Sequence, residues 1–216
     1  MIKAIFLDYT GTMVREDDPY TKQLLKIFIT SSSLRDPKEA LRVVWGMIKK
    51  SEWEDYQETF IKKDEMVERI LDICEKEYQL CADRKTVHDI WRDSWIHAPL
   101  FDDVKPFVQR CSLPVYVVTN DDLCYVEQSL REKELSVAGI ISAELVRACK
   151  PHREILEEAV RVAAVDPSEA VMIGDSETSD VRCALETGIV PILLDRKGTS
   201  DRTDIRVVRS LEELSF

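Results

Sequence analysis

The chain has 216 residues, a formal net charge of −11, and a hydrophobic content of 44%. This length and apolar content suffice for one large domain with a smaller insertion. The acidic charge argues against nucleic acid as a partner, because binding to a polyanion requires a basic surface. No run reaches the roughly 18 apolar residues of a membrane helix, and the six cysteines lack the spacing of a zinc site. We therefore expect a cytosolic protein that binds neither nucleic acid nor membrane.

The first third of the chain contains one strand pattern followed by helical patterns. The apolar run at residues 2–7 predicts a buried strand. Residues 15–97 show no convincing strand, and helix starts are indicated at Asp36 and near Asp64. We expect this whole block to be helical.

An aromatic stripe lies inside this helical block. Trp53, Tyr56 and Phe60 fall close to helical spacing. Such a stripe usually packs against neighbouring helices rather than against a ligand. We therefore predict that these three side chains lie in a core between the helices of the block.

From residue 100 onwards, short strand patterns alternate with helical patterns. This alternation predicts a parallel sheet with helices on both faces. The strands are expected at residues 114–118, 139–141, 170–173 and 189–194. The sequence thus predicts an α/β fold, with a Rossmann-like core from residues 1–14 and 98–216 and an all-helical insertion from residues 15–97.

Acidic side chains follow two of the predicted strands, at the edge of the sheet where parallel α/β proteins bind ligands. The first strand ends at Asp8, and the strand at 170–173 is followed by Asp175 and Asp180. Three carboxylates at one edge would repel one another unless a cation neutralised them. Hard oxygen ligands of this kind suit Mg²⁺. The sequence therefore predicts a magnesium site.

Three further polar residues are expected at the same edge. Thr119 and Asn120 follow the strand at 114–118, and Lys150 precedes a helical pattern that starts at Glu154. A threonine after a strand also suits a helix cap, and a lysine before a proline also suits the solvated surface. None of the three identifies the chemistry by itself.

The order of these residues resembles the haloacid dehalogenase-like superfamily of hydrolases. The resemblance covers essentially the whole chain and is carried by four motifs in the family's order: Asp8-x-x-x-Thr12, Thr119, Lys150 and Gly174-Asp175-x-x-x-x-Asp180. The helical insertion after the first motif is similar to the superfamily's mobile cap. We expect it to move about hinges near residues 12–15 and 95–101.

The resemblance implies a Mg²⁺-dependent phosphohydrolase that acts on a small phosphorylated metabolite. Asp8 would attack phosphorus and form a phosphoaspartate that water then hydrolyses. Mg²⁺ would be held by Asp8, the backbone carbonyl of Thr10 and Asp175. Asp180 would lie behind them and orient a water on the metal. The groups implied to bind the phosphoryl oxygens are Thr119, Asn120 and Lys150.

Thr10 departs from the family's commonest phosphatases. In these enzymes the residue two beyond the nucleophile is a second aspartate, which transfers protons to the leaving group and from water. A threonine hydroxyl cannot exchange protons usefully at neutral pH, whereas metal binding needs only the backbone carbonyl. We therefore expect slow hydrolysis of esters with poor leaving groups.

Three alternatives follow from the same departure. Phosphonoacetaldehyde hydrolases also lack the second aspartate, and Gly46-Met-Ile-Lys49 resembles their cap motif with its Schiff-base lysine. Haloacid dehalogenases need no metal, but their fourth motif is less acidic. A binding protein without activity would have no reason to keep Asp8 together with Lys150 and the two later acids. The natural substrate and the oligomeric state are left open.

Overall fold

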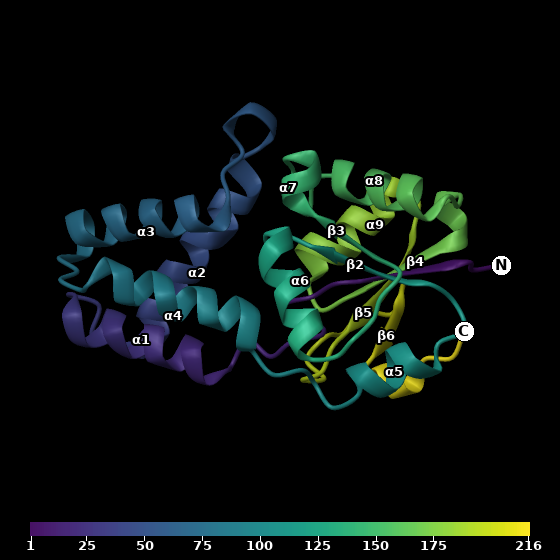
Figure 1. Cartoon of the computed structure of the whole chain (residues 1–216), viewed down its shortest axis with the longest axis horizontal. Coiled ribbons are helices and arrows are strands. Elements are labelled where there is room, and N and C mark those ends of the chain that lie inside the picture. Colours follow the sequence, from purple (N-terminus) through teal and green to yellow (C-terminus); the bar gives the residue numbers. More distant parts are fainter.

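A parallel sheet forms the centre of the larger part of the molecule in the computed structural model, which describes residues 1–216 (Figure 1). Six strands lie in the order β3-β2-β1-β4-β5-β6, and every neighbouring pair is parallel. The strands are β1 (Ala4–Leu7), β2 (Val115–Thr119), β3 (Gly139–Ser142), β4 (Ala170–Gly174), β5 (Val190–Leu194) and β6 (Arg206–Val208). The predicted α/β class is confirmed. The strand β6 at the edge of the sheet was not predicted, because three residues are too short to show a pattern.

Helices cover both faces of this sheet. They are α5 (Val104–Arg110), α6 (Leu123–Glu132), α7 (Ala143–Val146), α8 (Glu154–Ala163) and α9 (Arg182–Thr187). In β1, Ile5 and Leu7 point into one apolar core, and Ala4 and Phe6 point into a second core. Both faces are buried because parallel strands are joined by crossover helices on either side. No helix in the molecule is both long and apolar enough to cross a membrane.

The helical insertion contains four α-helices, which follow β1 and precede β2 in the chain. These are α1 (Pro19–Ser31), α2 (Pro37–Glu54), α3 (Lys63–Tyr78) and α4 (Arg84–His97). They pack around a third core that includes Phe28, Ile70 and Trp91. The side chain of Asp36 accepts a hydrogen bond from the backbone N–H of Glu39 and caps α2, as its sequence predicts.

Two linkers join the helical insertion to the sheet, and they lie side by side. Val14 and Leu100 form an antiparallel bridge, and the Arg15 N–H donates to the Pro99 carbonyl at 2.9 Å. The predicted boundaries, between residues 14 and 15 and between residues 97 and 98, fall in these linkers.

The prediction that Trp53, Tyr56 and Phe60 lie between helices of the insertion is wrong. The helix α2 ends at Glu54, so the helical spacing does not continue to Tyr56. The side chains of Trp53 and Tyr56 instead stack on His152 of the sheet domain, with ring centroids 5.4 and 4.3 Å apart. Phe60 packs against the second core of the sheet domain.

Residues 53–62, which we call the strap, therefore form a second junction between the helical insertion and the sheet domain. Figure 1 shows this segment rising from the end of α2 beside α7. Arg147 donates from Nε to the Gln57 carbonyl at 2.7 Å, and Lys62 pairs with Glu144 at 2.8 Å. The insertion is thus held to the sheet domain at the linkers and at the strap.

Candidate active site

The carboxyl edge of the sheet and the helical insertion enclose a cavity of about 280 Å³. Ligand sites of α/β proteins are expected at this edge. The cavity is lined by every residue that the sequence nominated for the site: Asp8, Thr10, Thr119, Asn120, Lys150, Asp175 and Asp180. The topology explains this gathering, because β1, β2 and β4 are neighbours in the sheet and end at the same edge.

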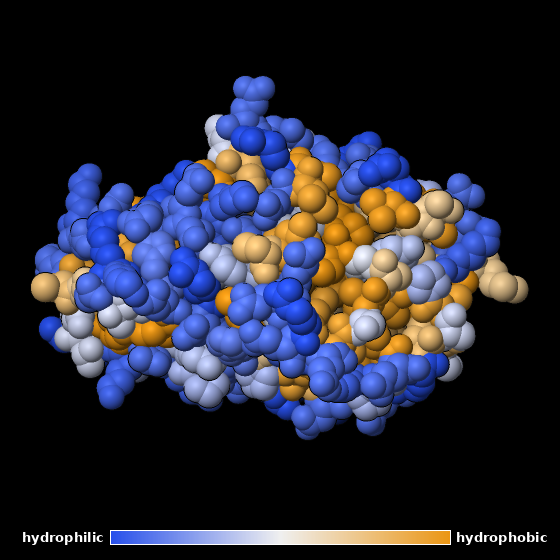
Figure 2. All heavy atoms as spheres, in the orientation of Figure 1, coloured by the Kyte–Doolittle hydropathy of each residue, from blue (hydrophilic) through white to orange (hydrophobic).

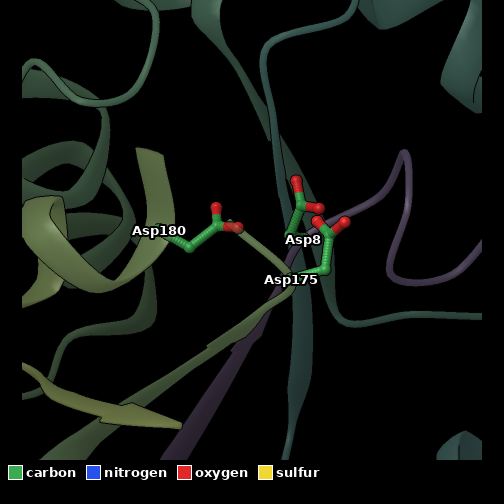
Figure 3. A group of neighbouring side chains, drawn as sticks. All are labelled: Asp8, Asp175 and Asp180. Carbon is green, nitrogen blue, oxygen red and sulfur yellow. The ribbon is translucent and has the colours of Figure 1, made fainter. Parts of the chain in front are cut away.

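Three carboxylates meet in this cavity. One oxygen each of Asp8, Asp175 and Asp180 lies within 4.8 Å of the others (Figure 3). Asp8 and Asp180 are buried, and Asp175 is the most exposed of the three. The backbone N–H of Asp8 donates to the Ile173 carbonyl at 2.9 Å, so the end of β1 is held firmly beside β4.

Two glycines make room for these carboxylates. A Cβ atom at Gly11 would lie 2.4 Å from Asp175 Oδ2, and Gly11 also has a left-handed backbone with a φ of +86°. A Cβ atom at Gly174 would lie 2.2 Å from Asp180 Oδ2. The glycines of the first and fourth motifs are thus needed for the close approach of the acids.

The carboxylates disfavour one another's ionised form. Burial, followed by the charge of Asp180, raises the pKa of Asp8 to about 8. Enclosure in the cavity and the charge of Asp180 raise the pKa of Asp175 to about 7. A divalent cation would relieve this repulsion, and a set of carboxylate and carbonyl oxygens fits Mg²⁺. The donor set therefore fits the predicted metal.

Lys150 lies at the centre of the acidic group. Its Nζ donates to Asp8 Oδ1 at 2.5 Å, to Asp180 Oδ1 at 2.7 Å and to the Val118 carbonyl at 2.9 Å. Burial alone would lower the pKa of Lys150, but the charges of Asp180 and Asp8 outweigh burial and hold that pKa above its ordinary value. Lys150 is only 2% exposed, which excludes the solvated surface position considered for it.

Thr119 is the last residue of β2, and Asn120 follows it and contacts Lys150. The N-cap of α6 is Asp122, so Thr119 is not the helix cap. Instead, the Thr119 hydroxyl lies 3.0 Å from the backbone N–H of Asp121, from which it accepts. The Asn120 side chain accepts from the Lys150 N–H at 2.7 Å and donates to the Lys150 carbonyl at 3.1 Å. Asn120 therefore fixes the backbone that carries the lysine.

Asp121 is a site residue that the sequence reasoning did not nominate. The Thr10 hydroxyl donates to Asp121 Oδ2 at 2.8 Å, and Asp121 lines the cavity with only 6% of its surface exposed. Its position two residues after Thr119, at the end of a predicted strand, could have indicated that it lies at the same edge of the sheet. The hydroxyl of Thr10 is thus committed to a carboxylate that the family motifs do not include.

A chain of charges continues from Asp121 into the helical insertion. Asp121 lies 3.6 Å from Lys63 Nζ, and Lys63 Nζ lies 3.3 Å from Glu52. Glu52 also pairs with Lys49 at 3.0 Å. Burial lowers the pKa of Lys49, but Glu52 outweighs it and raises that pKa overall. Lys49 is therefore an ammonium in an ion pair, whereas a Schiff base requires a free amine.

Known proteins share both the sequence pattern and the fold. Residues 2–188 match the family of haloacid dehalogenase-like hydrolases. An L-2-haloacid dehalogenase from Xanthobacter autotrophicus superposes with a TM-score of 0.76 at 15% identity, over 99% of this chain and 96% of that one. No curated protein sequence matches significantly.

Two further solved structures are similar in fold. A HAD-hydrolase from Bacillus subtilis, YfnB, described as putative and bound to magnesium, has a TM-score of 0.72 at 19% identity, over 98% of this chain and 96% of that one. A HAD phosphatase from Thermococcus onnurineus has a TM-score of 0.69 at 20% identity, over 98% and 95%. At these identities the likeness establishes the fold, and the reaction has to be argued from the site.

Proposed function

This chain belongs to the haloacid dehalogenase-like hydrolases, and from that premise we propose that it is a Mg²⁺-dependent phosphohydrolase of small phosphorylated metabolites. The supporting observation is the group of three carboxylates within 4.8 Å of one another. A nucleophilic aspartate must be ionised, and two further carboxylates at this distance oppose its ionisation. The single ammonium of Lys150 does not offset burial and this repulsion together, since the pKa of Asp8 is raised to about 8.

The carboxylates of Asp8 and Asp175 and the backbone carbonyl of Thr10 would hold Mg²⁺. When bound, the ion would neutralise charge between the carboxylates and the phosphoryl oxygens of the substrate. Asp180 is engaged elsewhere, because its oxygens accept from Lys150 at 2.7 Å and from the Ser176 N–H at 3.0 Å. We assign Asp180 to positioning Lys150 and the loop after β4.

In the proposed reaction an oxygen of Asp8 attacks phosphorus in line with the ester oxygen, and the phosphorus–ester bond breaks. Lys150 holds Asp8 Oδ1 and so orients the carboxylate for the attack. Water then attacks the phosphoaspartate, releases phosphate and restores Asp8. Thr119 and Asn120 line the same cavity. The Thr119 hydroxyl, which donates to Asp121 Oδ2 at 3.1 Å, would turn to a phosphoryl oxygen, and the Asn120 side chain would act by holding the backbone of Lys150 in place.

Thr10 determines which esters react well. Its hydroxyl is bound to Asp121 and cannot supply a proton to a departing alkoxide. The leaving group must therefore depart without general acid help from position 10, which is worth roughly 10²- to 10⁴-fold in rate. Esters with activated leaving groups are expected to react faster than alkyl phosphates.

Haloacid hydrolysis is the second candidate, and the names of several similar structures favour it. Six of these structures are described as dehalogenases. The acidic loop after β4 weighs against this reaction for the present chain, because ionising Asp8 without a metal works against Asp175 and Asp180. Cleavage of a carbon–phosphorus bond through Lys49 is less favoured, because Lys49 is ion-paired with Glu52.

One comparison tests the proposal. Phosphate release from 4-nitrophenyl phosphate and halide release from 2-chloropropionate are measured with Mg²⁺ and with excess chelator. We expect phosphate release that requires Mg²⁺ and is abolished in Asp8→Asn. Halide release that persists in chelator, without phosphate release, would overturn the proposal in favour of a dehalogenase.

A further inference from the structure

A second, apolar cavity of about 70 Å³ lies inside the helical insertion, between α1, α2 and α4. Eight of its nine lining residues are hydrophobic, and the ninth is Thr21. Thr21, Trp45, Ile48 and Trp91 line both this cavity and the active-site cavity. The two cavities thus adjoin at these four residues, and we name the second one the apolar annex.

We infer that the apolar annex receives the leaving group of the substrate, and that this group is apolar and uncharged. This inference rests on the proposed phosphohydrolase function and assigns its substrate class: monophosphate esters of alcohols or phenols with an apolar substituent. The phosphoryl group would lie at Lys150 and Asp8, and the substituent would extend past Trp45 and Trp91 between the helices.

Each cationic side chain that lines the active-site cavity already contacts a carboxylate. Lys150 is paired with Asp8 and Asp180, and Lys49 and Lys63 share Glu52. Arg15 stacks on the Phe101 ring at 4.6 Å and lies 3.7 Å from Asp102. Carboxylates outnumber cations in the lining of the cavity. A substrate with a further carboxylate or phosphate would therefore be repelled.

Two large apolar side chains of the apolar annex remain in contact with solvent. Trp45 is 36% exposed and Leu41 is 47% exposed, although both are large apolar side chains at the cavity. The rest of the insertion has a largely hydrophilic outer surface in the view of Figure 2. A cationic group would lose its hydration in the annex without gaining a charged partner, since no charged residue lines it. An apolar group would instead cover part of this exposed apolar surface.

Three aryl phosphates test this inference: phenyl phosphate, 4-butylphenyl phosphate and 4-carboxyphenyl phosphate. All three have phenolic leaving groups, so the lack of an acid at Thr10 affects them similarly. We expect kcat/KM to rise at least tenfold from phenyl to 4-butylphenyl phosphate. We expect it to fall for the 4-carboxyphenyl ester. Equal rates for the phenyl and butylphenyl esters, or a preference for the carboxylate, would overturn the inference.

Two variants locate the effect. Leu41→Asp places a charge at the annex, and Val44→Phe fills part of it. Both positions are partly exposed to solvent, so neither substitution should prevent folding. We expect both to bring the ratio of kcat/KM for the butylphenyl and phenyl esters close to one. Leu185→Asp on α9 is the matched control, because Leu185 is 51% exposed and lines neither cavity, and it should preserve the ratio. An unchanged ratio in both L41D and V44F would overturn the inference.

Calorimetric titration separates this inference from the proposed function. If no ester releases phosphate, the phosphohydrolase proposal fails, and binding of 4-butylphenol and 4-hydroxybenzoate to the same protein decides the inference. Binding of 4-butylphenol that is weakened at least tenfold in L41D supports the annex. Binding of 4-hydroxybenzoate as tight as that of 4-butylphenol contradicts it.

Discussion

At the scale of single residues, the Thr10 hydroxyl donates to Asp121 at 2.8 Å. This contact determines which substitution at position 10 can add a general acid. An aspartate at position 10 would meet the carboxylate of Asp121, and two acids in contact raise one another's pKa. We therefore expect the double variant T10D/D121N, rather than T10D alone, to accelerate hydrolysis of alkyl phosphates, by up to about 10²-fold. Steady-state phosphate release measures this effect, and 4-nitrophenyl phosphate should respond much less. Rapid turnover of alkyl phosphates by the unmodified protein would contradict the role assigned to Thr10.

Lys150 gives a second prediction, on stability. Lys150→Met leaves Asp8 and Asp180 without their shared partner in a buried site, and breaking such a pair costs about 3–5 kcal/mol. Urea unfolding of the metal-free protein measures the loss in the free energy of unfolding. Lys62→Met is the matched control, because the pair of Lys62 with Glu144 lies at the surface and contributes about 1 kcal/mol or less. Equal losses in both variants would show that Lys150 is not held as the structure has it.

The residues that could be predicted from the sequence are those at strand ends. Asp8, Thr119 and Asp175 each follow an apolar run, and parallel strands bring their carboxyl ends to one edge. Glu52 and Lys63 could not be found in this way. Lys63 reaches Asp121 from the helical insertion and Glu52 pairs with Lys63, and nothing in their local sequence indicates these contacts.

At the scale of elements, the strap is the junction that sequence patterns misplace. Trp53 and Tyr56 have helical spacing, but α2 ends between them, and the pattern cannot show which partner an aromatic ring finds. The alternating strands and the capped helices were predictable because their periodicity reflects burial on local faces. The strap depends instead on His152, about one hundred residues away in the chain.

The strap gives a prediction of its own. His152→Ala removes both stacking contacts and the hydrogen bond between His152 Nε2 and the Trp53 carbonyl, which is 2.9 Å long. We expect a loss of about 1–2 kcal/mol in local stability. Hydrogen exchange should accelerate at the amide of Gln57, which donates to the Arg147 carbonyl at 2.8 Å. His88→Ala is the control, since His88 contacts Glu68 within the insertion, and unchanged strap exchange in H152A would refute the junction.

At the scale of the whole molecule, the acidic site links stability to pH and to the metal. The pKa of Asp8 is raised from 3.8 to about 8 by burial and by Asp180, so between these values the folded protein binds more protons than the unfolded chain. The free energy of unfolding of the metal-free protein should therefore fall as the pH rises from about 4 to about 8, and level off above that. Asp175, with a pKa of about 7, contributes in the same direction.

If the proposed metal site is correct, Mg²⁺ should oppose this loss, because it would bind only the ionised carboxylates of the folded protein. A free Mg²⁺ concentration about 100 times its dissociation constant should add about 2.7 kcal/mol to the free energy of unfolding. Since protons compete with the ion at Asp8 and Asp175, the gain should be small at pH 6 and larger at pH 8. Thermal unfolding with and without Mg²⁺ at pH 6, 7 and 8 measures it, with Asp175→Asn as the control that should lose most of the Mg²⁺ effect. A melting temperature that Mg²⁺ does not change at any of these pH values would contradict the metal's part in the proposed reaction. Lys150 would then be the one group that balances the repulsion among the three acids.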